Sequence, residues 1–116
     1  MLEVQSRKQG TCDVLDVSGE IDGIGLEEFK EGLLKAEEAG DGAVILNFTE
    51  VVFISSSGLG ALVAFYKRLR AKDRQLAVYG LRDVIQQVFE IVRLNKVITL
   101  AGSEEEACRL VQAVKE

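Results

Sequence analysis

Short apolar runs alternate with longer amphipathic segments along most of the chain. The first two runs, residues 2–7 and 12–17, are joined by a turn at Gln9-Gly10, which predicts an opening β-hairpin. Residues 43–46 are apolar without alternation, as is typical of a strand covered on both faces in a parallel sheet. We therefore expect this strand in the interior of a sheet.

Four amphipathic segments carry apolar residues at three- and four-residue spacing, and each predicts a helix with one buried face. In the third helix we expect Val84, Val88 and Val92 to face inward. The fourth begins with a capping-box pattern, Ser103-Glu104-Glu105-Glu106, which places acidic residues in its first turn. The predicted helices cover residues 26–39, 58–72, 81–93 and the segment after Ser103; short strands are expected over 76–79 and 97–100, and loops over 19–25 and 47–57.

The predicted order of elements is β-β-α-β-α-β-α-β-α. Regular alternation of strand and helix after the hairpin predicts an α/β fold with a mixed, mostly parallel β-sheet and about four helices. A length of 116 residues fits a single domain, residues 1–116. Apolar residues make up 47% of the chain and charged residues 28%, which is typical of a globular protein with a core.

Composition excludes several functions. The chain has no histidine, which removes Ser-His and Cys-His nucleophile pairs and most zinc sites. Cys12 and Cys108 match no metal or redox spacing, and we expect both to behave as small buried hydrophobes. A net charge of -5 argues against direct nucleic-acid binding. With neither a secretory leader nor an apolar stretch of the ~18 residues that a membrane span needs, we expect a cytoplasmic protein without membrane insertion.

One basic cluster lies at the end of the second predicted helix. Cations there complement the negative end of the helix dipole, so we expect these side chains to face solvent. A patch that docks a partner is the alternative. The cluster consists of Lys67, Arg68, Arg70, Lys72 and Arg74.

Three serines meet two glycines where a loop leads into the second predicted helix, in Ser55-Ser56-Ser57-Gly58-Leu59-Gly60. The first N–H groups of a helix have no partner within it, so this place suits an anion. One interpretation is structural: serine is a preferred N-cap, and we expect Ser57 to cap because Gly58 follows directly. The other is that one hydroxyl accepts a phosphoryl group, or that the loop binds a phosphate.

Familiar catalytic motifs are absent from this segment. Gly58-x-Gly60 opens a helix, but Val63 occupies the third glycine position of the dinucleotide-binding fingerprint, and no acidic residue ends the next strand. No phosphate-binding G-K-[ST] sequence occurs. The G-x-S-x-G elbow of hydrolases fails because Ile54 stands where glycine is required. We therefore expect no enzyme, and no cofactor or bound metal.

Two motifs together resemble a known family. The first is Gly19-Glu20-Ile21-Asp22 after the second strand, and the second is the long segment 45–60, which ends in Ser55-Ser56-Ser57-Gly58-Leu59-Gly60. They look like the STAS domain of bacterial anti-sigma factor antagonists, and the resemblance covers essentially the whole chain. The sequence departs from the family pattern at Ser55 and Asn47, where aspartate is usual.

The resemblance implies which residues form the site. The serine two places before the first glycine is the family's phosphoacceptor, and here that residue is Ser56. Asp22 is expected beside it, with Ser55, Ser57 and Gly58 as neighbours. Ile24 lies between Gly23 and Gly25 and has little local packing, so we expect it to be an exposed contact for a partner. Leu59 is a second expected partner-binding residue.

The resemblance also implies partners. An antagonist of this family binds an anti-sigma factor that is also a serine kinase and so frees a sigma factor; phosphorylation ends the binding, and a serine phosphatase restores it. The alternative is a scaffold STAS subunit of a lipid-exporting ABC transporter or a stress-signalling assembly, without a phosphorylation cycle. A nucleotide phosphate at the helix start is a third possibility. We expect a monomer or weak dimer.

Overall fold

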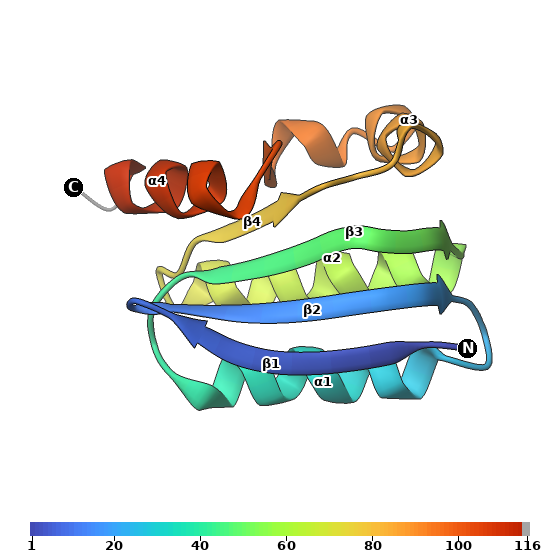
Figure 1. Cartoon of the computed structure of the whole chain (residues 1–116), viewed down its shortest axis with the longest axis horizontal. Helices are drawn as coiled ribbons and strands as arrows, with labels where there is room; N and C mark the ends of the chain where they lie inside the picture. Colours follow the sequence, from blue (N-terminus) through green and yellow to red (C-terminus); the bar gives the residue numbers. More distant parts are fainter. Residues whose placement is uncertain (115–116) are drawn as a thin grey trace.

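The computed structural model describes residues 1–114, in which five strands form one sheet in the order β1-β2-β3-β4-β5 (Figure 1). β1 pairs with β2 in the antiparallel direction, and all other neighbouring strands are parallel. The mixed α/β sheet, its opening hairpin and the interior position of residues 43–46 are therefore confirmed. The strands are β1 (Glu3–Gln9), β2 (Cys12–Ile21), β3 (Val44–Ile54), β4 (Leu76–Tyr79) and β5 (Thr99–Ala101).

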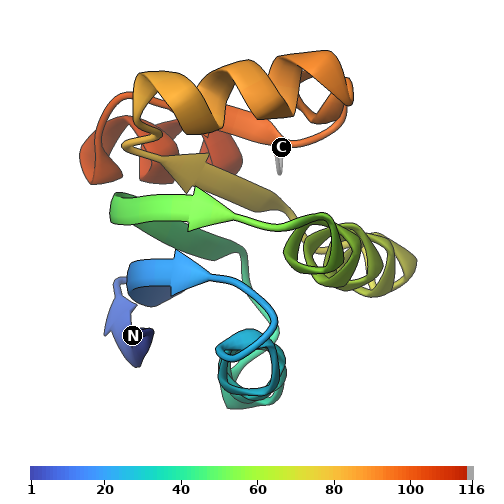
Figure 2. The same ribbon diagram turned by 90° about the vertical axis from the view of Figure 1, so that its right-hand side faces the viewer.

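The two faces of the sheet are covered unequally. Figure 2 shows α1 and α2 side by side on one face and α4 on the other. The main core lies on the α1–α2 side, where Phe48 of β3 contacts Phe29 and Phe89 with ring centroids 6.4 Å away in each case. The helices are α1 (Leu26–Ala39), α2 (Ser56–Ala71), α3 (Asp83–Ile91) and α4 (Glu104–Val114), with a 3-10 turn over Leu94–Lys96.

Strands β2 and β3 extend further than predicted. The predicted loop over 19–25 begins only after Ile21, and most of the predicted connection over 47–57 belongs to β3, which ends at Ile54. The register between the two strands shifts twice, and β3 contributes the extra residue each time. Such bulges interrupt the in–out alternation of a strand, which explains why the sequence pattern did not show this half of β3.

Helix α3 turns a different face inward than predicted. Its buried residues are Ile85 and Phe89, whereas Val84 and Val92 are exposed. The apolar residues of this short helix spread over one broad face, so spacing alone could not choose which part of that face is buried. The last strand also shifts, because residues 94–96 form the 3-10 turn and pairing with β4 starts at Thr99.

The basic cluster is not wholly solvent-facing, contrary to the prediction. Arg68 Nε and Lys72 Nζ lie 2.9 and 2.8 Å from the carboxylate oxygens of buried Glu37. Burial alone would raise the pKa of Glu37, but these two cations hold it below its ordinary value. Arg74 is only 8% exposed and donates to the carbonyls of Gly42 and Glu37, near the end of α1. The cluster therefore fastens α2 to α1.

The cysteines and the fourth helix largely follow their sequence patterns. Cys12 is buried as predicted, whereas Cys108 is half-buried. The hydroxyl of Ser103 accepts a hydrogen bond from the N–H of Glu106, as in a capping box, while Glu106 accepts one from the N–H of Gly102. No helix among residues 1–114 has the length and apolar character required to cross a membrane.

Candidate functional site

Helix α2 starts directly after β3, and Ser55 forms the junction. The Ser55 hydroxyl accepts a hydrogen bond from the Gly58 N–H at 3.1 Å, which makes Ser55 the N-cap. The prediction that Ser57 caps the helix is therefore wrong. Because the strand runs to Ile54, the helix begins two residues earlier than the glycine spacing indicated. Ser56 and Ser57 are its first two residues, and both are exposed.

The two glycines of this segment have different surroundings. A Cβ atom on Gly58 would lie 2.7 Å from Ile21 Cγ2 and 3.0 Å from Ile54 Cγ1, so only glycine fits between α2 and the sheet. A Cβ atom on Gly60 would contact nothing within 4 Å. Leu59 is half-buried and packs against the main core, so only part of its side chain is available to a partner.

The loop from β2 to α1 lies next to the serines. The Ser55 N–H donates to the Ile21 carbonyl at 2.8 Å, which fixes the end of β2 beside the start of α2. One carboxylate oxygen of Asp22 accepts hydrogen bonds from the N–H groups of Ile24 and Gly25, at 3.1 and 3.0 Å. Asp22 thus shapes its own loop, and this loop holds Ile24 outward with 94% of its surface exposed.

Ser56 is exposed and its hydroxyl has no role in the hydrogen bonding of the described fold. Its side chain makes no hydrogen bond with any residue that the structure describes, whereas Ser55 caps the helix and its oxygen lies 3.4 Å from that of Ser57. The first turn of α2 has no acidic residue. The positive end of the helix dipole would stabilise a phosphate on Ser56 by roughly 0.3–1 kcal/mol.

Exposed apolar side chains accompany the serines. Val52 and Phe53 lie near the end of β3 and are about half exposed. Phe53 pairs with Glu20 of β2. These residues were predicted to lie in a loop, and their role as exposed apolar groups was not predicted. The available signal was the apolar run over residues 51–54, because a regularly alternating strand would bury only every second residue of this run. With Ile24, Val52 and Phe53 give this end of the sheet an apolar surface.

Among residues 1–114 no group of three or more Cys, Asp or Glu side chains is placed to hold a metal ion. The site offers an exposed hydroxyl, a helix N-terminus and apolar contacts. These features suit modification of a serine and binding of a protein surface.

Comparison with known proteins defines the class. The family model of the STAS domain matches residues 3–107. The anti-sigma-B factor antagonist of Listeria monocytogenes is 33% identical over 106 residues, which cover 90% of this chain and 91% of that protein. The chain therefore belongs to the STAS-domain family of anti-sigma factor antagonists, which are regulatory proteins and not enzymes.

Solved structures agree with this fold at lower identity. The crystal structure of an anti-sigma factor antagonist from Mycobacterium paratuberculosis has a TM-score of 0.86 at 19% identity, with 97% of this chain and 95% of that chain covered. The Bacillus cell fate determinant SpoIIAA in its phosphorylated form has a TM-score of 0.70 at 24% identity, with 94% and 99% covered.

Proposed function

We propose that this protein is a phosphorylation-controlled switch that sequesters an anti-sigma factor kinase and so frees a sigma factor, with Ser56 as the phosphoacceptor. The observation that carries the proposal is the division of roles between neighbouring serines. Ser55 has a structural role as the N-cap, and Ser56 is exposed beside it with no hydrogen-bonding role in the fold. Because sigma factors act on RNA polymerase, the proposed switch operates in the cytoplasm.

Electrostatics supports the direction of the switch. A phosphate adds about -1.5 to -2 charges where Ser56 is now neutral. The helix start tolerates this charge, but an apolar partner surface pressed against Ile24 and Phe53 would not. A charge buried at an interface without a counter-ion costs several kcal/mol, which corresponds to about a 10³-fold loss of affinity. Phosphorylation would therefore release the kinase, and removal of the phosphate by a serine phosphatase would restore binding.

The position before the acceptor bears on both candidate functions. Ser55 stands where aspartate is usual in the family, and both residue types are preferred N-caps. Ser55 therefore keeps the cap, while the negative charge beside Ser56 is lost. The loss of this charge favours one alternative, a scaffold STAS subunit that uses the same surface without a phosphorylation cycle.

Intact-mass measurement after incubation with native lysate and ATP tests the acceptor. Wild type and Ser57→Ala are expected to gain a phosphate, and Ser56→Ala is not. Incorporation that persists in Ser56→Ala and disappears in Ser57→Ala would overturn the assignment, and its absence from every variant would favour the scaffold.

Binding of the captured kinase tests the surface. Ile24→Asp should weaken binding without changing the melting temperature, because this side chain is almost fully exposed. The matched control is Val97→Asp, since Val97 is 50% exposed and lines a hollow with Gly42 and Gln75 near the start of β4. Equal loss of binding in both variants would contradict the proposed surface.

A further inference from the structure

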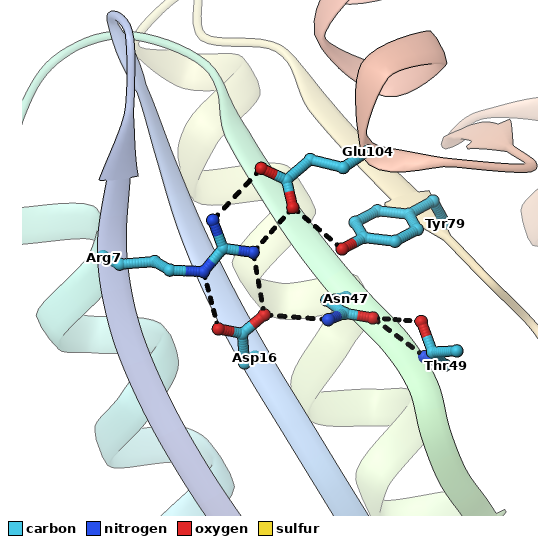
Figure 3. Close-up of polar contacts among 6 residues, drawn as sticks. All are labelled: Arg7, Asp16, Asn47, Thr49, Tyr79 and Glu104. Atoms are coloured by element: carbon cyan, nitrogen blue, oxygen red, sulfur yellow. Dashed lines mark hydrogen bonds and ion pairs between the residues drawn. The ribbon is translucent and has the colours of Figure 1, made fainter.

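A chain of polar side chains crosses the sheet face that carries α4, and Arg7 stands at its centre (Figure 3). The Arg7 guanidinium donates hydrogen bonds to the Asp16 carboxylate of β2 from Nε and Nη2, at 2.7 and 3.1 Å. It also donates to the Glu104 carboxylate of α4 from Nη1 and Nη2, at 3.1 and 2.6 Å. One side chain of the N-terminal strand thus holds the first residue of the C-terminal helix.

Two further residues bond directly to the carboxylates of Asp16 and Glu104. Tyr79 of β4 donates its hydroxyl to Glu104 at 2.9 Å, and Asn47 of β3 donates its amide to Asp16 at 2.8 Å. Hydrogen bonds from Arg7 hold the pKa of Asp16 and of Glu104 below their ordinary values. We call Arg7, Asp16 and Glu104 the clasp. It contains two carboxylates and one cation, so loss of Arg7 would leave two acids facing each other.

Apart from the clasp, α4 has a small attachment to the sheet. Among its residues up to Val111, the buried side chains are Ala107 and Val111, which pack on an apolar cluster separate from the main core. All four of the largest fully buried aromatic side chains lie in the main core on the opposite face. Release of α4 would expose a small surface and leave the packing of α1 and α2 intact. The part of the sheet beneath α4 consists of Cys12, Val14, Ile45, Ala77 and Tyr79.

We propose that the Arg7 clasp controls a local opening in which α4 leaves the sheet as a unit while the rest of the fold persists. The opened state presents the apolar surface beneath α4, on the face opposite α1 and α2. Since Arg7 and Asp16 are partly exposed, dissolved salt screens the clasp and favours opening. The N-terminal hairpin thereby sets the population of a state defined by the C-terminal helix.

The thiol of Cys12 provides a direct reporter, because it is only 1% exposed beneath α4. The sequence has two cysteines, so Cys108→Ser leaves Cys12 as the single thiol. In this background Arg7→Gln should raise the rate of reaction with an aromatic disulfide reagent by about tenfold or more, the effect of losing charge-assisted hydrogen bonds. Added salt should accelerate labelling in the parent and have less effect in Arg7→Gln.

Arg82→Gln is the matched control, since Arg82 is similarly exposed and binds Glu50 and the Thr49 carbonyl, neither of which belongs to a residue of the clasp. It should change the labelling rate less than about twofold. Arg7→Lys, which keeps the charge but not the two-pronged geometry, should fall between parent and Arg7→Gln. Amide exchange distinguishes local opening from unfolding: α4 amides should lose protection in Arg7→Gln while α2 amides keep theirs. Equal labelling in Arg7→Gln and parent, or equal loss of protection in α2 and α4, would overturn the proposal.

Discussion

The two ends of the parallel strands carry different kinds of side chain. The carboxyl ends of β2 and β3 lie at the right of Figure 1. Exposed serines, a glycine-rich helix start and the exposed apolar side chains of Ile24 and Phe53 lie at these strand ends. The amino ends of these strands are closed by buried charge. Asp13 at the start of β2 is 2% exposed and lies 2.6 Å from Lys8 and 3.6 Å from Arg74.

The closed end also completes a helix that lacks its own C-terminal cations. α1 has no basic residue in its last turn, yet Lys8 donates to the Ala39 carbonyl at 3.2 Å and Arg74 to the Glu37 carbonyl at 2.8 Å. Residues distant in the chain thus satisfy carbonyls that the helix leaves unpaired. Buried ion pairs and contacts to the end of α1 thus lie at the amino end, whereas the carboxyl end carries exposed side chains.

Breaking the closed end should have the largest effect. Arg74→Met removes a buried guanidinium that lies 3.6 Å from the Asp13 carboxylate and binds two carbonyls, and it should lower the free energy of unfolding by about 3 kcal/mol. Urea denaturation measures this change. Arg70→Met is the control, because exposed Arg70 bonds only to the Tyr66 hydroxyl among the described residues, and it should cost less than about 0.5 kcal/mol. Similar losses in the two variants would contradict the comparison.

Replacement by alanine of the two glycines at the start of α2 should change the stability of the protein in opposite directions. Gly58→Ala pushes a methyl group against Ile21 and Ile54 and should destabilise the protein by about 1–3 kcal/mol. Gly60→Ala meets open space inside a helix and should stabilise it by about 0.5–1 kcal/mol. Both values come from the denaturation midpoint at constant slope. A stable Gly58→Ala variant would mean that α2 does not need its close approach to the sheet.

The two serines beside Ser56 should change stability by about 1 kcal/mol or less. Ser55→Ala removes the oxygen that accepts the Gly58 N–H and should cost about 1 kcal/mol. Ser57→Ala, at an exposed position two residues further along, should stay within about 0.5 kcal/mol of wild type. Thermal unfolding of both variants separates them. If Ser57→Ala proved the more costly, the cap would belong to Ser57 after all.

Parts of the fold and of the site could be predicted from the sequence because their signals are local. The hairpin turn at Gly10, which has a φ of +63°, and the capping box at Ser103 depend on residues a few positions apart. The exposed position of Ile24 followed from its two flanking glycines. By contrast, nothing within four residues of Asn47 indicated that its amide would bind Asp16, which is 31 positions away.

The amino-acid sequence by itself determined the kind and order of elements, because helical and strand periodicity and turn chemistry act over one to four residues. The tertiary structure decided which serine caps α2, since that depends on how far β3 pairs with β2 and on the bond from Ser55 to Ile21. It also decided which face of α3 is buried and which cations reach Glu37, 31 and 35 positions away. These choices depend on side chains that meet only after the chain has folded, and local patterns carry no record of such contacts.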